Sequence, residues 1–342
     1  MRVPKSALPL GQLEWNGVPL TYSHWPNTGL GYARKVFDKG AVYADGRTKG
    51  PKPKCHLCEN GATSTQTAPC GANISFAEQP SGNWAAEMKA GPGFGAVSIS
   101  GYFSADWYHE SHIIAKVVQT ASNTSVQMAS FSRYGFCEAL EHNGGCGGSA
   151  PGRFTVQGLL SEVDYPGEYF FDTAANVLYI YPATPPGGGK VKLGYWHGPG
   201  LITLNKCNYV TVRDVQVSGC AKDTAITISG GANNTVGGCT LRNSRNGVTI
   251  SGGTGNKVVG NDIYDVGGHI SMSGEPSSNL QNFQTTTNLV ANNHLTQVYL
   301  RGHAWQLRVD GMGSRFSHNL AHDSSSQLML PGGPLVMTDR CI

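Results

Sequence analysis

Charged residues are scarce in this chain of 342 residues, and they do not gather by sign. Asp, Glu, Lys and Arg make up 14% of the sequence, and the formal net charge is +3. The densest basic stretch is KGPKPK at 49–54, where Pro and Gly indicate a solvated loop. A nucleic-acid partner is therefore not expected, because such binding needs a concentrated basic surface.

Long hydrophobic runs are also missing. No apolar stretch approaches the roughly 20 residues that a membrane-spanning helix needs. The N-terminus, MRVPKSALPLGQLEWNG, lacks the sustained apolar segment of a secretion signal. The glycine-rich stretches GPGFG (91–95) and GGCGG (144–148) lack the Lys-Ser/Thr that phosphate binding requires. We expect no membrane span, no nucleotide site and no signal within this chain.

Glycine and proline are abundant instead, with 46 and 18 residues, which is typical of a turn-rich β protein. The last third repeats related phrases: AITISGGANNTVGGCTL at 225–241, GVTISGGTGNKVVGNDI at 247–263, TTNLVANNHLTQV at 286–298 and LRVDGMGSRFSHNLAHD at 307–323. Such phrases, separated by Gly and Asn at intervals of roughly 20–30 residues, indicate a parallel solenoid. Its long outward rows of side chains suit an extended ligand, above all a polysaccharide.

The chain is predicted to divide near residue 198. We expect an irregular β-rich region over 1–198, with a long cysteine-bearing surface loop at 40–83, and parallel β-helix coils over 199–342. The predicted fold class is all-β.

One column of small polar residues precedes the inward aliphatic residue of each coil: Cys239, Asn261, Asn293 and Asn319. Stacked asparagines would satisfy backbone groups that the bend leaves unpaired, and Asn tolerates the left-handed conformation expected there. The uneven spacing along this column predicts an insertion at 266–285, which would line a binding face and supply His269 and Glu275.

Nine cysteines give an odd count. Five lie in Gly- and Asn-rich loops of the first half and are predicted to form disulfides: Cys55, Cys58, Cys70, Cys137 and Cys146. Three sequons mark candidate glycosylation sites at Asn73, Asn123 and Asn233. Both features favour an extracellular protein whose targeting signal lies outside this chain. A zinc site at Cys55 and Cys58 is disfavoured, because zinc needs four ligands and His56 lies between the two cysteines.

The chain resembles the secreted right-handed parallel β-helix proteins of pectate-lyase type, and most closely the branch with glycoside hydrolases of fucosidase and xylanase type. The resemblance rests on these phrases: LSEVDYPGEYFFD (160–172), VLYIYP (177–182), HWPN (24–27), Asp106-Trp107 and HNLAHD (318–323). It covers about residues 15–325 and implies a glycoside hydrolase acting on an extracellular polysaccharide. Relatives of this kind begin earlier and continue for further coils, so we expect truncation at both ends. The open C-terminal end would then be capped by missing coils or a protein partner.

Glycoside hydrolysis needs two carboxyl groups. The repeat alignment places Asp265 and Asp323 in one column, two coils apart, so coil stacking would separate them by about 10 Å. That spacing lies at the upper edge of the inverting range. The alternative is that each Asp only caps a turn through its own backbone.

Asp310 is the third catalytic candidate. It replaces the Ser229/Ser251 position of the repeat, and Arg308 lies two residues earlier on the same face. Arg308 would hold Asp310 ionised or bind a sugar carboxylate; a surface ion pair worth little is the alternative.

His318 and His322 flank the asparagine column, and the resemblance favours His322, with Asp323, as a catalytic residue. The other predicted substrate-binding residues, besides Arg308 and His318, are Glu275, Arg301, His303 and Trp305. A structural role is the alternative for each histidine.

Two other functions stay open. A polysaccharide lyase of this fold would use Ca²⁺, but no dense Asp cluster offers the oxygen ligands, Asp262 with Asp265 being the nearest. A non-catalytic carbohydrate-binding or structural β-helix would bind glycan without turnover. No metal or other cofactor is otherwise expected.

Overall fold

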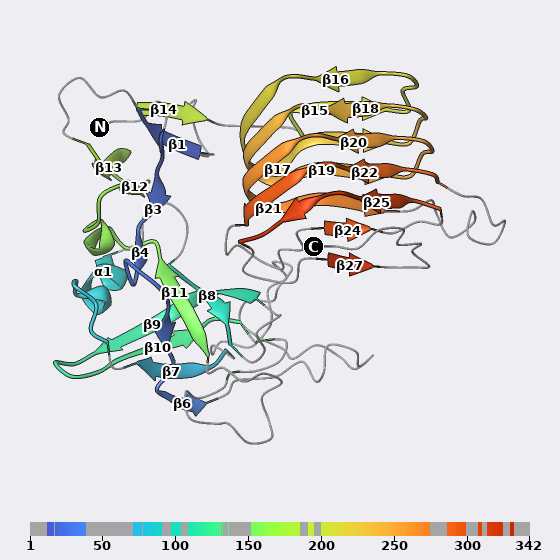
Figure 1. Ribbon diagram of the computed structural model, residues 1–342. Helices are drawn as coiled ribbons and strands as arrows, with labels where there is room; N and C mark the ends of the chain where they lie inside the picture. Colours follow the sequence, from blue (N-terminus) through green and yellow to red (C-terminus); the bar gives the residue numbers. More distant parts are fainter. Residues whose placement is uncertain are drawn as a thin grey trace. The chain divides into compact units, whose positions relative to one another are not determined.

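The computed structural model describes residues 12–16, 18–38, 71–76, 78–90, 97–103, 109–130, 132, 136, 152–184, 191–194, 200–273, 286–298, 307–309, 313–323 and 329–331. These residues form two compact units, one within residues 14–192 and the other within 193–342 together with the start of the first strand. Both units are built mostly of β-strands, which confirms the predicted fold class (Figure 1).

The first unit contains short, mostly antiparallel strands and one α-helix, α1 (Trp84–Ala90). Its strands are β1 (Gln12–Trp15), β2 (Val18–Pro19), β3 (Thr21–Tyr22), β4 (His24–Trp25), β5 (Gly31–Tyr32), β6 (Lys35–Asp38), β7 (Asn73–Phe76), β8 (Ser98–Tyr102), β9 (His109–Gln119), β10 (Thr124–Met128), β11 (Arg153–Gln157), β12 (Glu168–Asp172), β13 (Val177–Tyr181) and β14 (Val191–Gly194).

The largest sheet of this unit has eight strands in the order β4-β11-β8-β9-β10-β7-β6, with β5 also paired to β11. Two three-stranded sheets, β13-β12-β3 and β14-β1-β2, complete the strand pairing. The strands β10 and β11 alternate buried and half-buried residues, as expected of strands with one face on a core.

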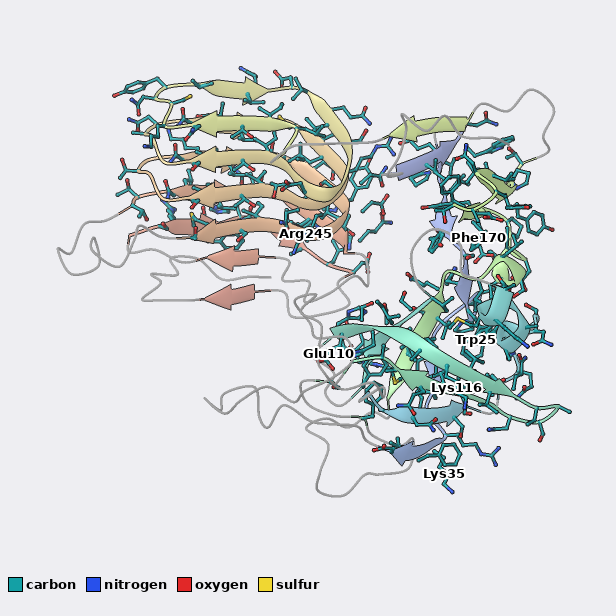
Figure 2. The ribbon with its side chains drawn as sticks, turned by 180° about the vertical axis from the view of Figure 1, so that it is seen from behind. Trp25, Lys35, Glu110, Lys116, Phe170 and Arg245 are labelled. Carbon is teal, nitrogen blue, oxygen red and sulfur yellow. The ribbon has the colours of Figure 1, made fainter. Side chains whose placement is uncertain are left out.

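An aromatic cluster forms the core of the first unit. Trp25 lies 4.9 Å from Phe76 and 5.6 Å from Trp84 of α1, ring centre to ring centre, and Phe154 packs 5.4 Å from Phe76 (Figure 2 labels Trp25). Aromatic pairs at these separations add about 0.5–1.5 kcal/mol each beyond the area that they bury. The cluster therefore fixes the helix against the large sheet.

Two of the phrases that carried the family resemblance meet in this unit. The carboxylate of Glu168, which is buried, lies 2.7 Å from Nδ1 of His24 and accepts hydrogen bonds from the backbone N–H groups of Asp164 and Tyr165. Glu162, also buried, accepts a 2.6 Å hydrogen bond from the indole N–H of Trp84. Glu168 and Glu162 therefore join this motif to β4 and to α1.

The second unit is a parallel β-solenoid of about four turns, as predicted. Its strands are β15 (Ile202–Asn205), β16 (Thr211–Arg213), β17 (Gln216–Ser229), β18 (Thr235–Gly237), β19 (Thr240–Ser251), β20 (Lys257–Val259), β21 (Asp262–Ser273), β22 (Leu289–Ala291), β23 (His294–Val298), β24 (Leu307–Val309), β25 (Arg315–Ser317), β26 (Leu320–Ala321) and β27 (Met329–Pro331).

Two parallel sheets run along the solenoid. One contains β15-β17-β19-β21-β23-β26, with β24 paired to β21 and β27, and the other contains β16-β18-β20-β22-β25 (Figure 1). Each strand pairs with its equivalent in the next coil, so equivalent residues lie at the strand spacing of about 4.8 Å.

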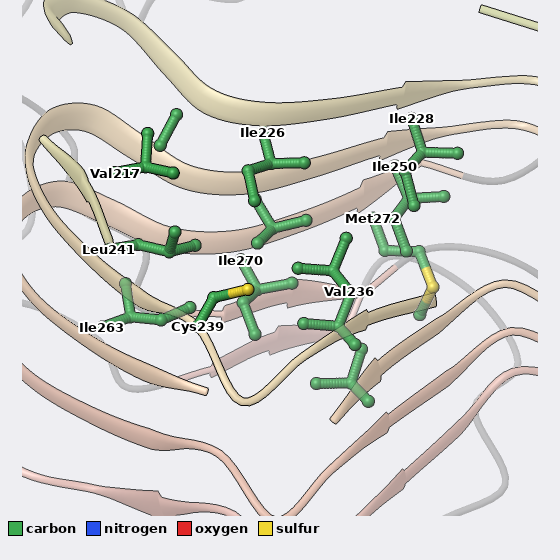
Figure 3. Close-up of a cluster of buried hydrophobic side chains, with 14 of the residues drawn as sticks. Val217, Ile226, Ile228, Val236, Cys239, Leu241, Ile250, Ile263, Ile270 and Met272 are labelled. Atoms are coloured by element: carbon green, nitrogen blue, oxygen red, sulfur yellow. The ribbon is translucent and has the colours of Figure 1, made fainter. Parts of the chain in front are cut away.

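The solenoid core is made of aliphatic columns, because the parallel register places equivalent aliphatic residues of successive coils above one another. Three such columns are Val217-Leu241-Ile263, Ile226-Val248-Ile270 and Ile228-Ile250-Met272. Figure 3 labels all of these residues except Val248. Every one of these side chains is buried. Because each coil contributes one residue to each column, the core repeats along the solenoid axis.

The predicted asparagine column is present as a hydrogen-bonded ladder. The side-chain oxygen of Asn293 accepts from both the backbone N–H and the amide of Asn261, at 3.0 and 2.9 Å, and Asn319 accepts in the same way from Asn293. The ladder asparagines are not the left-handed residues, which corrects the expectation. The residue before each one takes that conformation, as Asn292 (φ 55) and His318 (φ 54) do.

A second asparagine ladder, which the sequence analysis did not identify, lies at the other sheet. Asn256 accepts from the backbone N–H of Asn234 at 3.0 Å, and Asn288 accepts from that of Asn256 at 2.9 Å. All three residues are fully buried. The two ladders thus satisfy backbone donors at two bends of each coil.

The predicted insertion at 266–285 was placed too early. Residues 266–273 continue β21, and Ile270 and Met272 belong to the core columns. His269 is therefore fully buried within a strand and lines no insertion. The hydrophobic alternation of HISMS at 269–273 was the signal that should have excluded these residues from a loop.

The five cysteines predicted to form disulfides lie outside the described residues. Among the described residues, Cys207 and Cys239 are free thiols. Of the sequon asparagines, Asn73 lies in β7, Asn123 lies between β9 and β10, and Asn233 is exposed at a coil turn. In the part of the chain that the structure describes, no helix has the length and hydropathy that a membrane crossing requires.

Replacing Asn293 by Ala is expected to destabilise the solenoid by about 1–3 kcal/mol for each buried polar group left unpaired, starting with the backbone N–H of Asn261. Urea unfolding, with hydrogen exchange at the amides of β19, β21 and β23, measures the loss. Thr240→Ala, at a half-exposed position of β19, is the control. A variant as stable as wild type would show that the ladder does not hold the coils.

Glu162 predicts a pH dependence in the first unit. Burial raises its pKa above 4.5, against the hydrogen bond from Trp84, which lowers it. The unfolded chain then loses this proton at lower pH than the folded chain, so stability should fall as pH rises from about 4.5 through the folded pKa. Glu162→Gln keeps an acceptor for Trp84 and should remove this part of the fall. Urea unfolding of wild type and Glu162→Gln at pH 4 and pH 7 tests this prediction. An equal fall in the free energy of unfolding between the two pH values in both proteins would contradict it.

Candidate functional site

The outward face of the first solenoid sheet carries two neighbouring columns of mostly polar side chains, one on each side of the inward column Val217-Leu241-Ile263-Leu295-Ala321. The first column contains Gln216, Thr240, Asp262, His294 and Leu320. The second contains Ser218, Arg242, Tyr264 and Thr296, and His322 lies beside Thr296 at its end. Five successive strands contribute, so this face extends over roughly 19 Å at the strand spacing. We call it the outer face.

Four side chains of the outer face and of the adjoining turn form one hydrogen-bonded chain across three coils. Nδ1 of His294 lies 2.9 Å from Oδ1 of Asp262, and Nε2 of His294 lies 2.9 Å from Nε2 of His322. Nδ1 of His322 lies 2.8 Å from Oδ2 of Asp323. The order is therefore Asp262, His294, His322, Asp323.

The two carboxylates determine where the imidazole protons belong. An ionised carboxylate only accepts hydrogen bonds, so each histidine donates from Nδ1. Both Nε2 atoms then present a lone pair, and two lone pairs 2.9 Å apart repel. A cation between the two nitrogens, either a proton or a metal ion, removes this repulsion. The pair is thus built to hold a positive charge between two negative ones.

This chain of side chains faces solvent. The exposed fractions are 49% for Asp262, 44% for His294, 43% for His322 and 72% for Asp323. The hydroxyl of Thr296 also lies 3.3 Å from Nδ1 of His322. A ligand on the outer face therefore has direct access to all four groups.

His269 lies behind this face, within the core. Its Nε2–H donates a 2.9 Å hydrogen bond to the backbone carbonyl of Thr296, and its side chain is fully buried. Burial lowers the pKa of His269 to about 4, with smaller contributions from His294 and His322 that act in the same direction. It is a neutral residue that links β21 to β23.

Asp265 and Asp323 occupy one column, two coils apart, in the register that the repeat alignment gave. The residues that lie between or just beyond the paired positions of successive strands form this column: Gly219, Asn243, Asp265, Gln297 and Asp323. All five have positive φ. Gly, Asn and Asp are favoured there, because a left-handed backbone brings Cβ close to the following carbonyl oxygen, a strain that Gly avoids and that short polar side chains offset by local hydrogen bonds. The backbone alone is thus sufficient reason for an Asp at these positions, and any catalytic role is an addition to it.

Several predicted site residues lie outside the described residues: Glu275, Arg301, His303, Trp305 and Asp310. The backbone of Arg308 is described, and it pairs in register with Ser271 of β21. His318 is exposed in a left-handed turn position before Asn319. The roles predicted for all of these residues stay predictions.

Sequence reasoning gave His294 no role and considered Asp262 only as a calcium ligand. The signal was present: both residues stand one position before an inward aliphatic residue, Ile263 or Leu295, and so point outward in the same column. In the first unit, the ring of His112 is buried and packs against Phe103 and Phe136.

Residues 200–331 match the family described as "Right handed beta helix region", which confirms the predicted handedness of the solenoid. No curated protein matches the chain. A solved structure titled "Glycoside hydrolase" is similar at 10% sequence identity with a TM-score of 0.39, over 97% of this chain and 79% of that one. A TM-score this low establishes neither fold nor activity.

The buried His269 predicts how solenoid stability depends on pH. Its folded pKa of about 4 lies below its ordinary 6.5, so the unfolded chain takes up a proton first as pH falls. The stability that neutral His269 contributes is complete above pH 6.5 and is lost between pH 6.5 and 4, by up to about 3 kcal/mol.

His269→Gln keeps a donor for the Thr296 carbonyl and should show a smaller loss over this range, measured by urea unfolding at pH 7 and pH 4.5. His318→Asn, a change at an exposed histidine whose left-handed backbone Asn tolerates, is the control and should behave as wild type. A wild-type fall that His269→Gln reproduces in full would exclude His269 as its source.

Proposed function

We propose that the protein is a glycoside hydrolase that acts on an extended extracellular polysaccharide along the outer face of its solenoid. The observation that carries the proposal is the placement of Asp265 and Asp323 in one column, two coils apart, with Asp323 held by His322. The pairs Tyr264↔Thr296 and Leu295↔Ala321 keep the neighbouring residues in register from coil to coil, so coil stacking places the two Cα atoms about 10 Å apart. Carboxyl groups about 6.5–9.5 Å apart are those of an inverting hydrolase.

In this proposal Asp323 is the general base. His322 donates to Oδ2 and fixes the carboxylate's orientation, while the exposed side chain lets a water molecule reach the other oxygen. Asp265 is the general acid that protonates the leaving glycosidic oxygen. His294 and Asp262 complete the chain that orients His322.

The rest of the outer face supports a sugar polymer as substrate. Tyr264 presents an aromatic ring and Arg242 a guanidinium in the same column as Thr296. Hydroxyl groups of Thr240 and Ser218 continue the columns over earlier coils. An aromatic ring that packs on a sugar face, among hydrogen-bonding groups spread over several coils, suits a chain of repeating units better than a small metabolite.

The test compares wild type with Asp323→Asn and Asp265→Asn in reducing-sugar release from a panel of cell-wall polysaccharides. Loss of either acid–base group should lower kcat by about 10²–10⁴-fold with little change in KM. Asp214→Asn is the matched control, since Asp214 has the same left-handed backbone (φ 55) at another turn and should leave the rate unchanged. Equal activity in wild type and Asp323→Asn would refute the assignment.

A non-catalytic carbohydrate-binding β-helix is the second candidate, and the left-handed backbone at Asp265 and Asp323 favours it. It would bind a polysaccharide of the panel without releasing reducing ends. Release of products with ultraviolet absorbance, lost on chelation, would instead identify a polysaccharide lyase.

A further inference from the structure

The two histidines of the outer face present the elements of a metal site. We propose that His294 and His322 bind a divalent late first-row transition metal ion through their Nε2 atoms, Cu²⁺ in preference to Zn²⁺. The proposal does not depend on glycoside hydrolysis, since it concerns binding at the imidazole nitrogens alone.

Each histidine is prepared for this role by a carboxylate. Asp262 lies 2.9 Å from Nδ1 of His294, and Asp323 lies 2.8 Å from Nδ1 of His322. Histidines that bind metals almost always donate their other ring N–H to such a partner, which fixes the tautomer and leaves Nε2 as the ligand atom. Here both histidines have this arrangement, and both Nε2 atoms converge.

The separation of the two ligand atoms selects the geometry of the ion. Metal–imidazole bonds of about 2.0–2.1 Å place two nitrogens about 2.9 Å apart at a right angle and about 3.4 Å apart at a tetrahedral angle. The observed Nε2–Nε2 distance is 2.9 Å. Right angles are those of square-planar or tetragonal sites, which are typical of Cu²⁺ and Ni²⁺, whereas Zn²⁺ prefers a tetrahedron.

Charge and access agree with a bound cation. Two carboxylates flank the pair, so a divalent ion between the histidines brings the group close to neutrality, if both imidazoles are neutral. Both histidines are more than two-fifths exposed, so water or sugar hydroxyl groups can supply the remaining ligands. No group of three His, Cys, Asp or Glu that could hold a metal occurs among the residues that the structure describes, which makes this a two-histidine site open to solvent.

A shared proton is the competing occupant of the same position, because it also separates the two lone pairs. The two occupants differ in their response to added metal. A pair that holds only a proton binds Cu²⁺ no more tightly than any single exposed histidine does. A two-histidine site instead binds one ion through two nitrogens.

The experiment titrates the full chain with Cu²⁺, Ni²⁺ and Zn²⁺ by calorimetry and records the electron paramagnetic resonance of the Cu²⁺ complex. One Cu²⁺ should bind per chain with hyperfine splitting from two imidazole nitrogens, and Zn²⁺ should bind more weakly than Cu²⁺ by more than tenfold. His294→Gln and His322→Gln should each abolish the tight site. Asp262 is not a ligand in this proposal, so Asp262→Asn should only weaken the Cu²⁺ affinity, by about 10–100-fold.

His318→Asn is the matched control and should bind Cu²⁺ as wild type does. Retention of the tight site in both His294→Gln and His322→Gln would overturn the proposal, as would a signal from a single nitrogen. Equal loss in His318→Asn would overturn it too, because it would mean unspecific binding to surface histidines. Far-ultraviolet circular dichroism establishes that each variant is folded, and either of the two Gln variants suffices for the test.

Discussion

The stacked asparagine amides are the interaction on which the solenoid depends. At each bend the chain turns away from sheet pairing, so backbone N–H groups would be left buried without a partner. Asn261, Asn293 and Asn319 at one bend, and Asn234, Asn256 and Asn288 at another, accept these hydrogen bonds from the preceding coil. Because each oxygen serves the coil before it, the ladders also keep successive coils in register.

Register is what gives the outer face its chemistry. With equivalent residues aligned coil by coil, Asp262 and His294 fall in one column, and His322 lies beside Thr296 in the next. Residues separated by 26 to 32 positions in sequence therefore meet within hydrogen-bonding distance. A shift of one residue in any coil would turn these side chains into the core and bring the aliphatic columns to the surface.

The fold was predictable because a solenoid repeats its constraints, and the aliphatic columns and the ladder through Asn261 and Asn293 are visible as periodic phrases. The same periodicity placed Asp265 and Asp323 in one column. The assembly of Asp262, His294 and His322 did not, since hydrogen bonds between side chains depend on rotamers that no repeat specifies. His269 was assigned to a loop because spacing alone located the insertion, although its alternating neighbours show a buried strand.

The most direct test of the proposed catalytic pair is the anomeric configuration of the first sugar that the protein releases from a polysaccharide, followed by nuclear magnetic resonance during early turnover. Carboxylates two coils apart leave room for a water molecule between base and sugar, so the account predicts inversion. Retention would require carboxylates about 5–5.5 Å apart and would contradict the assignment of Asp265 and Asp323.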